Sequence, residues 1–207
     1  FKALQFQVNP HFLFNALNTI SWVCRENPEE ARKLLLTLAD YFRYNLNYDA
    51  YMVPLREELE HVKDYLQIEK ARFEEKLQVT YDVPEKMEIL VPTLILQPLV
   101  ENAVQHGIKN KTEKGMIDIS GCSLDGTIIL TVWDNGDGIS PETLEVLEND
   151  INEKELQDKK ENPHFGLWNS NQRLKLYFGE EYGIQMESEK GKYTSVTVRI
   201  PEKKYEG

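Results

Sequence analysis

The chain has 207 residues, of which 41% are hydrophobic and 29% are charged, and its formal net charge is −11. This length and composition fit one large or two small globular domains, and no apolar run is long enough to span a bilayer. The negative charge argues against a nucleic-acid-binding protein, which needs a basic face. The negative charge is still compatible with ATP binding, because local backbone amides and a metal ion can hold a single nucleotide.

A first helix is expected over residues 2–26. Because Phe1–Leu4 already follows the helical pattern, we expect the chain to be a piece of a longer protein whose upstream part is missing. Pro10 is the irregular position in this helix. Either it kinks the helix beside His11, or it marks the true start, with Asn9 as the N-cap and Pro10 at the first helical position.

His11 shares one side of this helix with Asn15 and Asn18. At about 100° per residue, that side is opposite to the apolar positions, which are Phe6, Leu13, Leu17 and Ile20. The simplest interpretation is a histidine on a solvated helix face, because most histidines are neither ligands nor nucleophiles. The alternative is a phosphorylatable imidazole opposite an apolar seam, and the second half of the chain favours it.

A second helix begins at Asn27-Pro28-Glu29-Glu30, where Asn27 is placed as the N-cap and Glu30 as the partner in a capping box. Its apolar positions recur every three to four residues: Ala31, Leu34, Leu35, Leu38, Tyr41 and Phe42. Two such helices form an antiparallel hairpin whose apolar stripe would be exposed in a single chain. We therefore expect a homodimer with a four-helix bundle, and a domain boundary that separates residues 1–50 from residues 51–207.

A charged helix is expected over residues 55–75, with its acids and bases on a solvated surface, followed by a strand over residues 77–83. The next helix, residues 92–106, carries Glu101, Asn102 and Gln105 on one side. Carboxylate and amide oxygens on a rigid helix suit Mg²⁺, which is usually bound together with phosphates and waters. The alternative is an ordinary polar helix face.

Two strands, residues 116–123 and 127–133, flank a turn, and the second strand ends in Asp134-Asn135-Gly136-Asp137-Gly138. A carboxylate at a strand end can accept a hydrogen bond from an adenine amino group, and glycines let the backbone approach a ligand closely. As a lone pattern this segment could also be a turn or a calcium loop, but the terminal glutamate of a calcium loop is missing.

The segment 140–163 is acidic and poor in apolar residues, which is typical of a mobile loop or lid. A helix follows from Phe165 through Arg173 to Tyr177, and the amides at its start would suit a phosphate. Strands over residues 184–188 and 193–200 close the chain.

Taken together, these segments resemble the LytS/YesM-type sensor histidine kinases over essentially the whole chain. The residues that carry the resemblance are Asn9–Asn15 as the phosphoacceptor motif, Tyr65–Phe73 as the approach to the catalytic domain, Glu101–Ala103 as the N box, Asp134–Gly138 as the first glycine box, and Gly166–Asn169 with Arg173 as the second. The N box and glycine boxes are those of the gyrase/Hsp90/histidine-kinase/MutL (GHKL) ATPases. Five motifs in the right order make the resemblance specific.

The resemblance implies an α+β fold: a helical hairpin that forms a four-helix bundle on dimerisation, then a GHKL-type α/β sandwich with helices on one face of a mixed sheet. It implies an ATP-dependent, autophosphorylating kinase core that uses Mg²⁺ and passes phosphate from His11 to an aspartate of a response-regulator receiver domain. Residues 140–163 would be the ATP lid. The chain would be the cytoplasmic portion of a membrane-anchored bacterial protein, with a sensor or membrane domain upstream.

The resemblance also implies residue roles. His11 would be phosphorylated, Asn15 would orient its ring, and Glu101 would polarise the attack; these are the expected catalytic residues. Asn102 would bind the magnesium ion and Asp134 would bind adenine. The complete expected nucleotide-binding set is Asn102, Gln105, His106, Asp134, Gly136, Gly138, Gly166, Leu167, Asn169, Arg173 and Thr194.

The sequence departs from the family pattern at four positions. Gln105 stands where such kinases often carry a lysine, and His164 and Tyr193 stand where glycine is common. Phe12 follows the phosphoacceptor, whereas many other histidine-kinase classes have an acid there. Three other functions remain open: a nucleotide-binding scaffold without transfer activity, a GHKL ATPase clamp, and a serine/threonine-directed kinase. Against the clamp, Pro98 stands where its catalytic glutamate would be.

Overall fold

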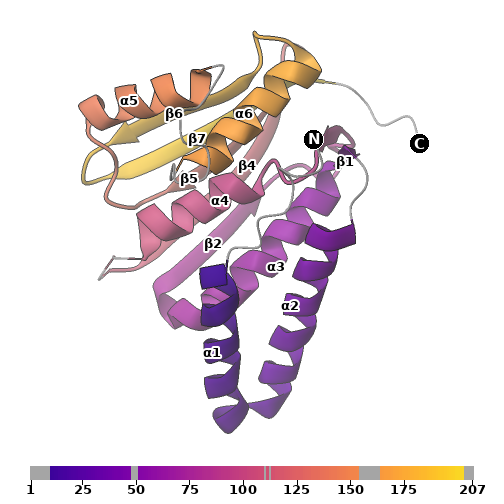
Figure 1. The fold of residues 1–207 in the computed structure, drawn as a ribbon, viewed down its shortest axis with the longest axis vertical. Coiled ribbons are helices and arrows are strands. Elements are labelled where there is room, and N and C mark those ends of the chain that lie inside the picture. Colours follow the sequence, from indigo (N-terminus) through magenta and orange to yellow (C-terminus); the bar gives the residue numbers. More distant parts are fainter. Residues whose placement is uncertain (1–9, 48–50, 110, 112, 154–163, 203–207) are drawn as a thin grey trace.

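The computed structural model describes residues 10–47, 51–109, 111, 113–153 and 164–202. A helical hairpin forms one end of the molecule, and a sheet with helices on one face forms the other (Figure 1). The α+β class expected from the sequence is confirmed.

The hairpin consists of α1 (Pro10–Glu26) and α2 (Pro28–Asn47). Asn27 caps α2 as predicted, because its Oδ1 accepts from the backbone N–H of Glu30 at 3.2 Å. In a capping box, the side chain of Glu30 would accept from the N–H of Asn27. Here that N–H donates to the carbonyl of Val23 at 2.8 Å instead. Whether the helix continues upstream of Pro10 concerns residues 1–9, which lie outside the described residues.

The buried side of α1 differs from the prediction. Leu17, expected in the apolar seam, is 45% exposed, and the residues that are buried are Phe12, Ala16, Ile20 and Val23. The reason is that α1 has apolar residues on more than one side. The side that carries Phe12 is the one that packs against α2 and α3 within the chain.

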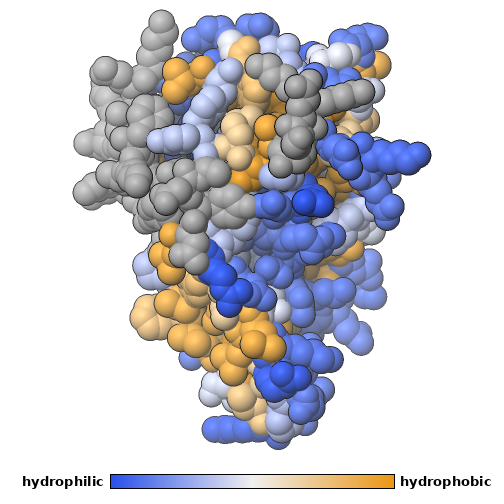
Figure 2. Space-filling view, turned by 90° about the vertical axis from the view of Figure 1, so that its right-hand side faces the viewer, coloured by the Kyte–Doolittle hydropathy of each residue, from blue (hydrophilic) through white to orange (hydrophobic). Residues whose placement is uncertain are grey.

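Other hydrophobic side chains of the hairpin stay exposed. Figure 2 shows hydrophobic residues gathered over the helical end of the molecule. The large ones exposed on α1 and α2 are Phe14, Leu17, Trp22, Leu35, Leu36 and Leu46. A contiguous apolar surface of this kind marks an interaction site.

The charged helix α3 (Leu55–Phe73) forms as predicted, followed by the short 3₁₀-helix η2 (Glu74–Lys76). The prediction that its charged residues lie on a solvated surface was wrong for Glu58, His61 and Glu69, each at most 3% exposed. The helix lies between α2 on one side and α4 and β2 on the other, so part of its polar face is covered.

The main sheet has five strands in the order β2-β4-β5-β7-β6. Only β2 and β4 pair in parallel, and the remaining neighbours are antiparallel, so the sheet is mixed as expected. The strands are β2 (Leu77–Asp82), β4 (Gly115–Leu124), β5 (Thr127–Asp134), β6 (Gly183–Glu189) and β7 (Tyr193–Pro201). The turn between β4 and β5 has positive φ at Asp125 and Gly126, which suits the twist of a tight hairpin.

A separate two-stranded sheet pairs β1 (Met52–Pro54) with β3 (Leu90–Pro92). The sequence did not predict it, because each strand has only three residues and ends in proline. This small sheet joins the start of α3 to the segment that leads into α4.

The helices that cover the main sheet are α4 (Gln97–Asn102), the π-helix η3 (Ala103–Ile108), α5 (Pro141–Asn152) and α6 (Phe165–Phe178). The predicted helix over residues 92–106 begins later than expected, at Gln97, because Thr93–Leu96 form a turn in which Leu94 has a φ of 58°. Apolar residues of this segment are buried: Leu96, Leu99, Val100, Ala103 and Val104.

The segment predicted as a mobile loop, residues 140–163, contains α5 in its first half. Ser140 caps this helix by accepting from the N–H of Thr143 at 3.3 Å. Leu147 and Ile151 are buried and attach α5 to the core. Two apolar anchors and a cap were enough to order a stretch whose average composition is polar, so the loop prediction was wrong here. Residues 154–163 lie outside the described residues.

Candidate functional site

Asp134 ends the central strand β5 and is 3% exposed. Its Oδ1 accepts from the N–H of Gly136 at 2.9 Å. Burial raises the pKa of Asp134 to about 6, although this hydrogen bond and the charge of Lys111 oppose the shift. One hydrogen bond uses only part of the acceptor capacity of a carboxylate, so Asp134 suits a further N–H donor such as an adenine amino group.

Glycines bring the end of η3 against this carboxylate. A Cβ atom on Gly107 would lie 2.3 Å from Asp134 Oδ1, and one on Gly136 would lie 2.2 Å from the Cα of Gly107. No side chain can replace hydrogen at either position without moving the backbone. Gly107 is a site residue that sequence reasoning missed, and its signal was a glycine directly after His106 at the end of the predicted helix.

Gly138 and Thr194 connect the same loop to the strands β6 and β7. Gly138 has a φ of 59°, and a Cβ atom there would lie 2.0 Å from the carbonyl oxygen of Glu189. Thr194 pairs in register with Asp134 and is 6% exposed. Ser188, which the sequence did not single out, accepts from the N–H of Ile139 at 2.8 Å and lies 3.1 Å from the hydroxyl of Thr194. The residues predicted to bind adenine are therefore brought together where strand β5 ends and β7 begins.

The second glycine box begins α6. Gly166 is exposed, and a Cβ atom there would approach Pro98 of α4 to 3.4 Å, so the starts of these two helices are neighbours. Leu167 is buried in the core, whereas Asn169 is half-buried. Arg173 lies further along α6, and its Nη2 is buried with no hydrogen-bond partner among the described residues. Burial lowers the pKa of Arg173, and the nearby charge of Glu58 opposes this.

Two further predicted residues lie in η3, where Gln105 and His106 are both exposed. The pKa of His106 is lowered by burial of its ring and by the charges of His164 and Lys109. His164 directly precedes α6. Because its charge affects the pKa of His106, the helix that carries the N box lies close to the second glycine box.

Glu101 and Asn102 close α4, and both are half-buried. Among the described residues there is no cluster of three or more acidic, histidine or cysteine side chains that could hold a metal alone. The amide oxygen of Asn102 fits Mg²⁺ in the manner common for nucleotides, in which one or two protein oxygens act together with phosphates and waters.

Glu101 belongs to a set of polar side chains from three helices, which we call the junction network: Tyr41 of α2, His61 of α3, and Gln97 and Glu101 of α4. The carboxamide of Gln97 donates to Glu101 Oε1 at 2.7 Å and to Tyr41 Oη at 2.5 Å, and its oxygen lies 2.9 Å from His61 Nε2. Burial raises the pKa of Glu101, and the hydrogen bond from Gln97 opposes the shift.

His11 is exposed on α1, and Asn15 lies one turn further along. The Nδ2 atom of Asn15 is 3.2 Å from His11 Nδ1 and 3.4 Å from Nε2, so the carboxamide faces the imidazole. The next residue, Phe12, is buried between Tyr41 and Tyr65, with ring centroids 5.0 and 4.9 Å away. The imidazole is therefore accessible, while its neighbour anchors α1 to α2 and α3.

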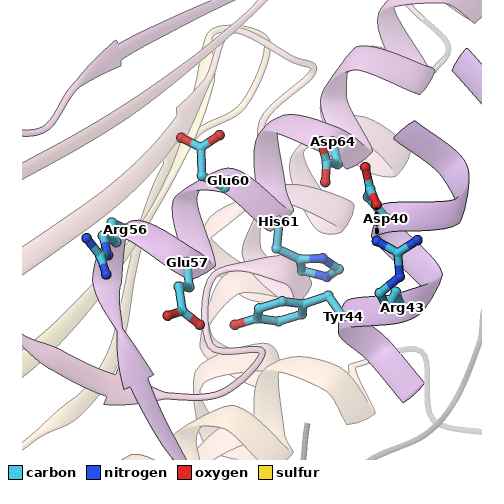
Figure 3. Close-up of a pocket in the computed structure, with 8 residues that line it drawn as sticks. All are labelled: Asp40, Arg43, Tyr44, Arg56, Glu57, Glu60, His61 and Asp64. Atoms are coloured by element: carbon cyan, nitrogen blue, oxygen red, sulfur yellow. Dashed lines mark hydrogen bonds and ion pairs between the residues drawn. The ribbon is translucent and has the colours of Figure 1, made fainter. Parts of the chain in front are cut away.

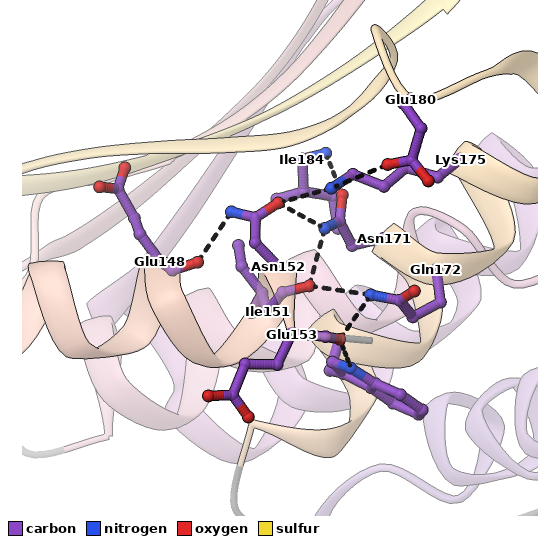
Figure 4. Close-up of polar contacts among 10 residues, drawn as sticks. Glu148, Ile151, Asn152, Glu153, Asn171, Gln172, Lys175, Glu180 and Ile184 are labelled. Atoms are coloured by element: carbon purple, nitrogen blue, oxygen red, sulfur yellow. Dashed lines mark hydrogen bonds and ion pairs between the residues drawn. The ribbon is translucent and has the colours of Figure 1, made fainter. Parts of the chain in front are cut away.

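The end of α5 is held by side chains of α6, which we call the α5–α6 clasp (Figure 4). Trp168 and Gln172 donate to the carbonyl of Glu153 at 2.9 and 3.0 Å, and Asn171 donates to that of Ile151 at 2.8 Å. The Oδ1 of Asn171 accepts from the N–H of Ile184 in β6 at 2.8 Å. These bonds satisfy the last carbonyls of α5 and position both helices that flank residues 154–163.

A pocket lies between α2 and α3 and shares His61 with the junction network (Figure 3). It is lined by Asp40, Arg43, Tyr44, Arg56, Glu57, Glu60, His61 and Asp64. Burial raises the pKa of Asp64 to about 6, and the charges of Asp40 and Glu60 add to the effect. Because acids outnumber arginines in its lining, this pocket is unsuited to a polyphosphate.

Two family models match the chain. One describes the "Histidine kinase" family and matches residues 1–77, and the other describes the "Histidine kinase-, DNA gyrase B-, and HSP90-like ATPase" family and matches residues 90–204. The chain belongs to the sensor histidine kinases. The resemblance to LytS/YesM-type kinases that the motifs indicated is confirmed by curated relatives.

This sensor histidine kinase chain is 42% identical to the sensor protein LytS of Bacillus subtilis (strain 168), over 97% of the chain and 33% of the relative. It is 42% identical to the sensor histidine kinase YpdA of Escherichia coli (strain K12), over 89% of the chain and 31% of the relative. The sensor histidine kinase YesM of Bacillus subtilis (strain 168) is 35% identical over 97% of the chain and 33% of the relative. The chain thus spans about a third of the length of the curated relatives it matches.

Solved structures show the same fold. The catalytic domain of histidine kinase ThkA superposes with a TM-score of 0.54 at 17% identity, over 74% of this chain and 99% of that chain. The histidine kinase AdeS of Acinetobacter baumannii gives 0.51 at 18% identity, over 83% of this chain and 77% of that chain. The GHKL-type sandwich is therefore confirmed. Among the helices of the described residues, none combines the length and hydrophobicity that a membrane span requires.

Proposed function

We propose that this chain is the ATP-dependent, autophosphorylating core of a sensor histidine kinase in a two-component system. Phosphate would pass from ATP to His11 and then to an aspartate on the receiver domain of a response regulator. The observation that carries the proposal is that one member of this family has both an exposed imidazole on α1 and, at Asp134, a buried carboxylate that can accept further hydrogen bonds.

For the nucleotide, we assign adenine recognition to Asp134, with Thr194 supporting it from β7. Gly136, Gly138 and Gly166 would leave room for the base and phosphates, and Asn102 would bind Mg²⁺, which offsets phosphate charge when bound. Gln105, His106, Asn169 and Arg173 would supply polar contacts, and Leu167 would help to shape the site from the core. The buried, unpartnered Nη2 of Arg173 supports a polar role for that residue.

Phosphoryl transfer depends mainly on positioning and electrostatics around a loose transition state. In our proposal the neutral imidazole of His11 attacks in line, and Asn15 keeps its ring oriented through the contact already described. Glu101 would help to polarise the attack and accept the proton that the ring loses. Phe12 cannot supply an acid beside the phosphoacceptor, which leaves this task to a residue of the catalytic domain.

We further propose that residues 1–50 form the dimerisation and phosphoacceptor hairpin, and residues 51–207 the ATP-binding domain. The exposed hydrophobic side chains of α1 and α2 support a homodimer in which two hairpins form a four-helix bundle. Because the chain spans about a third of its relatives, we place it as the cytoplasmic portion of a membrane-anchored bacterial protein with a sensor or membrane domain upstream.

The test is incubation with labelled ATP and Mg²⁺, followed by treatment with acid or alkali. We expect a labelled protein whose phosphate survives alkali and is lost in acid, and no label on His11→Ala. Asn18→Ala, an exposed polar residue on the same helix, is the matched control and should be labelled normally. Release of free phosphate from an unlabelled protein would identify an ATPase clamp. Nucleotide-dependent stabilisation without either product would identify a scaffold.

A further inference from the structure

The carboxamide of Gln97 has its hydrogen-bonding groups committed to three helices. Its two N–H groups donate to Tyr41 of α2 and Glu101 of α4, and its oxygen faces His61 of α3 at 2.9 Å. Tyr41 and His61 precede Gln97 by 56 and 36 residues, so these bonds join separate parts of the chain.

His61 faces the oxygen of this carboxamide. The imidazole is stacked between Tyr41 and Tyr44, with ring centroids 4.8 and 4.2 Å away, and is 2% exposed. Burial lowers the pKa of His61 to about 4, so the ring is neutral, and its Nε2 lies 2.9 Å from the Gln97 oxygen. The amide nitrogen of Gln97 points the other way and donates to Tyr41 and to the carboxylate of Glu101.

The position of α2 also determines the turn that leads into α4. Glu58 of α3 is completely buried and accepts from the backbone N–H groups of Leu94, Ile95 and Leu96 at 2.6, 2.8 and 3.2 Å. The hydroxyl of Tyr44 donates to the same carboxylate at 2.6 Å. Tyr41 and Tyr44 lie one turn apart on α2, so one helix of the hairpin contacts the start of α4 by two routes.

We propose that Gln97 is a positioning residue through which hairpin helix α2 sets the orientation of Glu101 beside the N-box asparagine. The proposal rests on the function given above. A displacement of α2 away from α3 would withdraw Tyr41, leave one N–H of Gln97 unpaired and release the carboxylate of Glu101. Because the network does not include Asp134, such a displacement would change the rate of phosphoryl transfer and leave nucleotide binding intact.

The test compares Tyr41→Phe, Gln97→Met and their double variant in the full chain. Tyr41→Phe removes only the hydroxyl and keeps the ring stacked on His61, and Gln97→Met removes hydrogen bonding at similar volume. Gln67→Met, an exposed glutamine on α3, is the matched control. We expect each single variant to reduce autophosphorylation at saturating ATP by about ten- to a hundredfold with KM unchanged, since small misplacements of catalytic groups have effects of this order.

Coupling between the sites gives the sharper readout. If both residues act on Glu101 through one chain of bonds, Tyr41→Phe adds little in the Gln97→Met background. Effects that multiply, effects seen in KM alone, or a rate equal to that of Gln67→Met would each overturn the proposal. Thermal melting checks that each variant is folded.

A second measurement does not depend on kinase activity. In Tyr41→Phe, backbone hydrogen exchange should become faster in α4 and stay unchanged in the loop after Asp134. Should the wild-type chain form no phosphohistidine, the proposed function fails, and this exchange pattern alone decides whether α2 is linked to α4. Unchanged exchange in α4 would overturn the link.

Discussion

The junction network and the α5–α6 clasp both join helices through polar side chains, but they are built differently. In the junction network, side chains bond to other side chains, three of them titratable, across sequence separations of up to 56 residues. In the clasp, most bonds run from neutral side chains to backbone carbonyls 15 to 20 residues away. Asn171 and Lys175 also donate to the side chain of Asn152. Backbone carbonyls cannot swing away, whereas side chains on separate helices can. The clasp therefore suits a permanent joint, and the junction network suits one that changes with the position of the hairpin.

The largest expected effect is in the clasp. Asn171→Ala removes the bonds to Ile151 and Ile184 at a completely buried position. The N–H of Ile184 is then unsatisfied, the carbonyl of Ile151 keeps only the longer bond from Gln172 at 3.3 Å, and a cavity is left. We therefore expect the free energy of unfolding to fall by about 4 kcal/mol. Urea denaturation measures this. Asn149→Ala, at an exposed position of α5, is the control and should be nearly neutral.

Tyr41→Phe provides the comparison with the junction network. It should reduce the free energy of unfolding by only about 1 kcal/mol while it slows phosphoryl transfer. A clasp variant that slowed transfer without destabilising the fold would remove the distinction between the two regions.

The second expected effect is a dependence of stability on pH, which should arise near the junction network and not in the clasp. Burial raises the pKa of Glu69 on α3 to about 7, the nearby Glu101 adds to the shift, and Arg72 opposes it. The folded protein therefore holds this proton more tightly than the unfolded chain. Its contribution to stability is complete below the unfolded pKa of 4.5, is lost as pH rises to about 7, and is constant above that.

We expect this single group to lower the free energy of unfolding by about 3 kcal/mol across that interval. Glu69→Gln should flatten the corresponding slope in urea titrations between pH 4.5 and 7. Equal slopes in the two proteins would show that Glu69 ionises as freely in the folded state as in the unfolded chain.

The smallest effect concerns the nucleotide site, which lies outside both networks. Acceptance of an adenine N–H requires ionised Asp134, whose pKa burial raises to about 6. Nucleotide affinity should thus weaken below that pH, approaching about tenfold, or 1.4 kcal/mol, per pH unit. Calorimetric titration with ADP from pH 5 to 8 measures it, and Asp134→Asn should remove the pH dependence. If nucleotide affinity fell more steeply with decreasing pH in Tyr41→Phe than in the wild type, the junction network would be linked to nucleotide binding. That result would contradict the proposal that the network does not affect nucleotide binding.

Much of the architecture followed from local patterns. The two hairpin helices, the charged helix and all five strands of the main sheet appeared where periodicity and turn residues predicted them. The motif residues Asp134, Gly136 and Thr194 were expected at one site, and strand pairing brings them there. Such features depend on neighbours within a few residues, which a sequence displays directly.

The wrong predictions concern residues whose packing partners come from distant parts of the chain. Glu58, His61 and Glu69 were predicted on a solvated face, but α2 and α4 cover them and supply hydrogen bonds or charges that a sequence does not place. Segment 140–153 was predicted as a loop from its average polarity, although Leu147 and Ile151 sufficed to bind α5 to the core.

By itself, the sequence determined the order of the hairpin helices, the charged helix and the strands of the main sheet, the family, and the residues available for chemistry, because periodicity and motif spacing are properties of the chain alone. Only the tertiary structure decided which polar residues are buried and which helices they connect. Burial depends on what packs against a side chain from outside its own element. Gln97 is the clearest instance: the sequence placed it only within a predicted helix, and its contacts with Tyr41 and His61 in the structure place it between the hairpin and the N box.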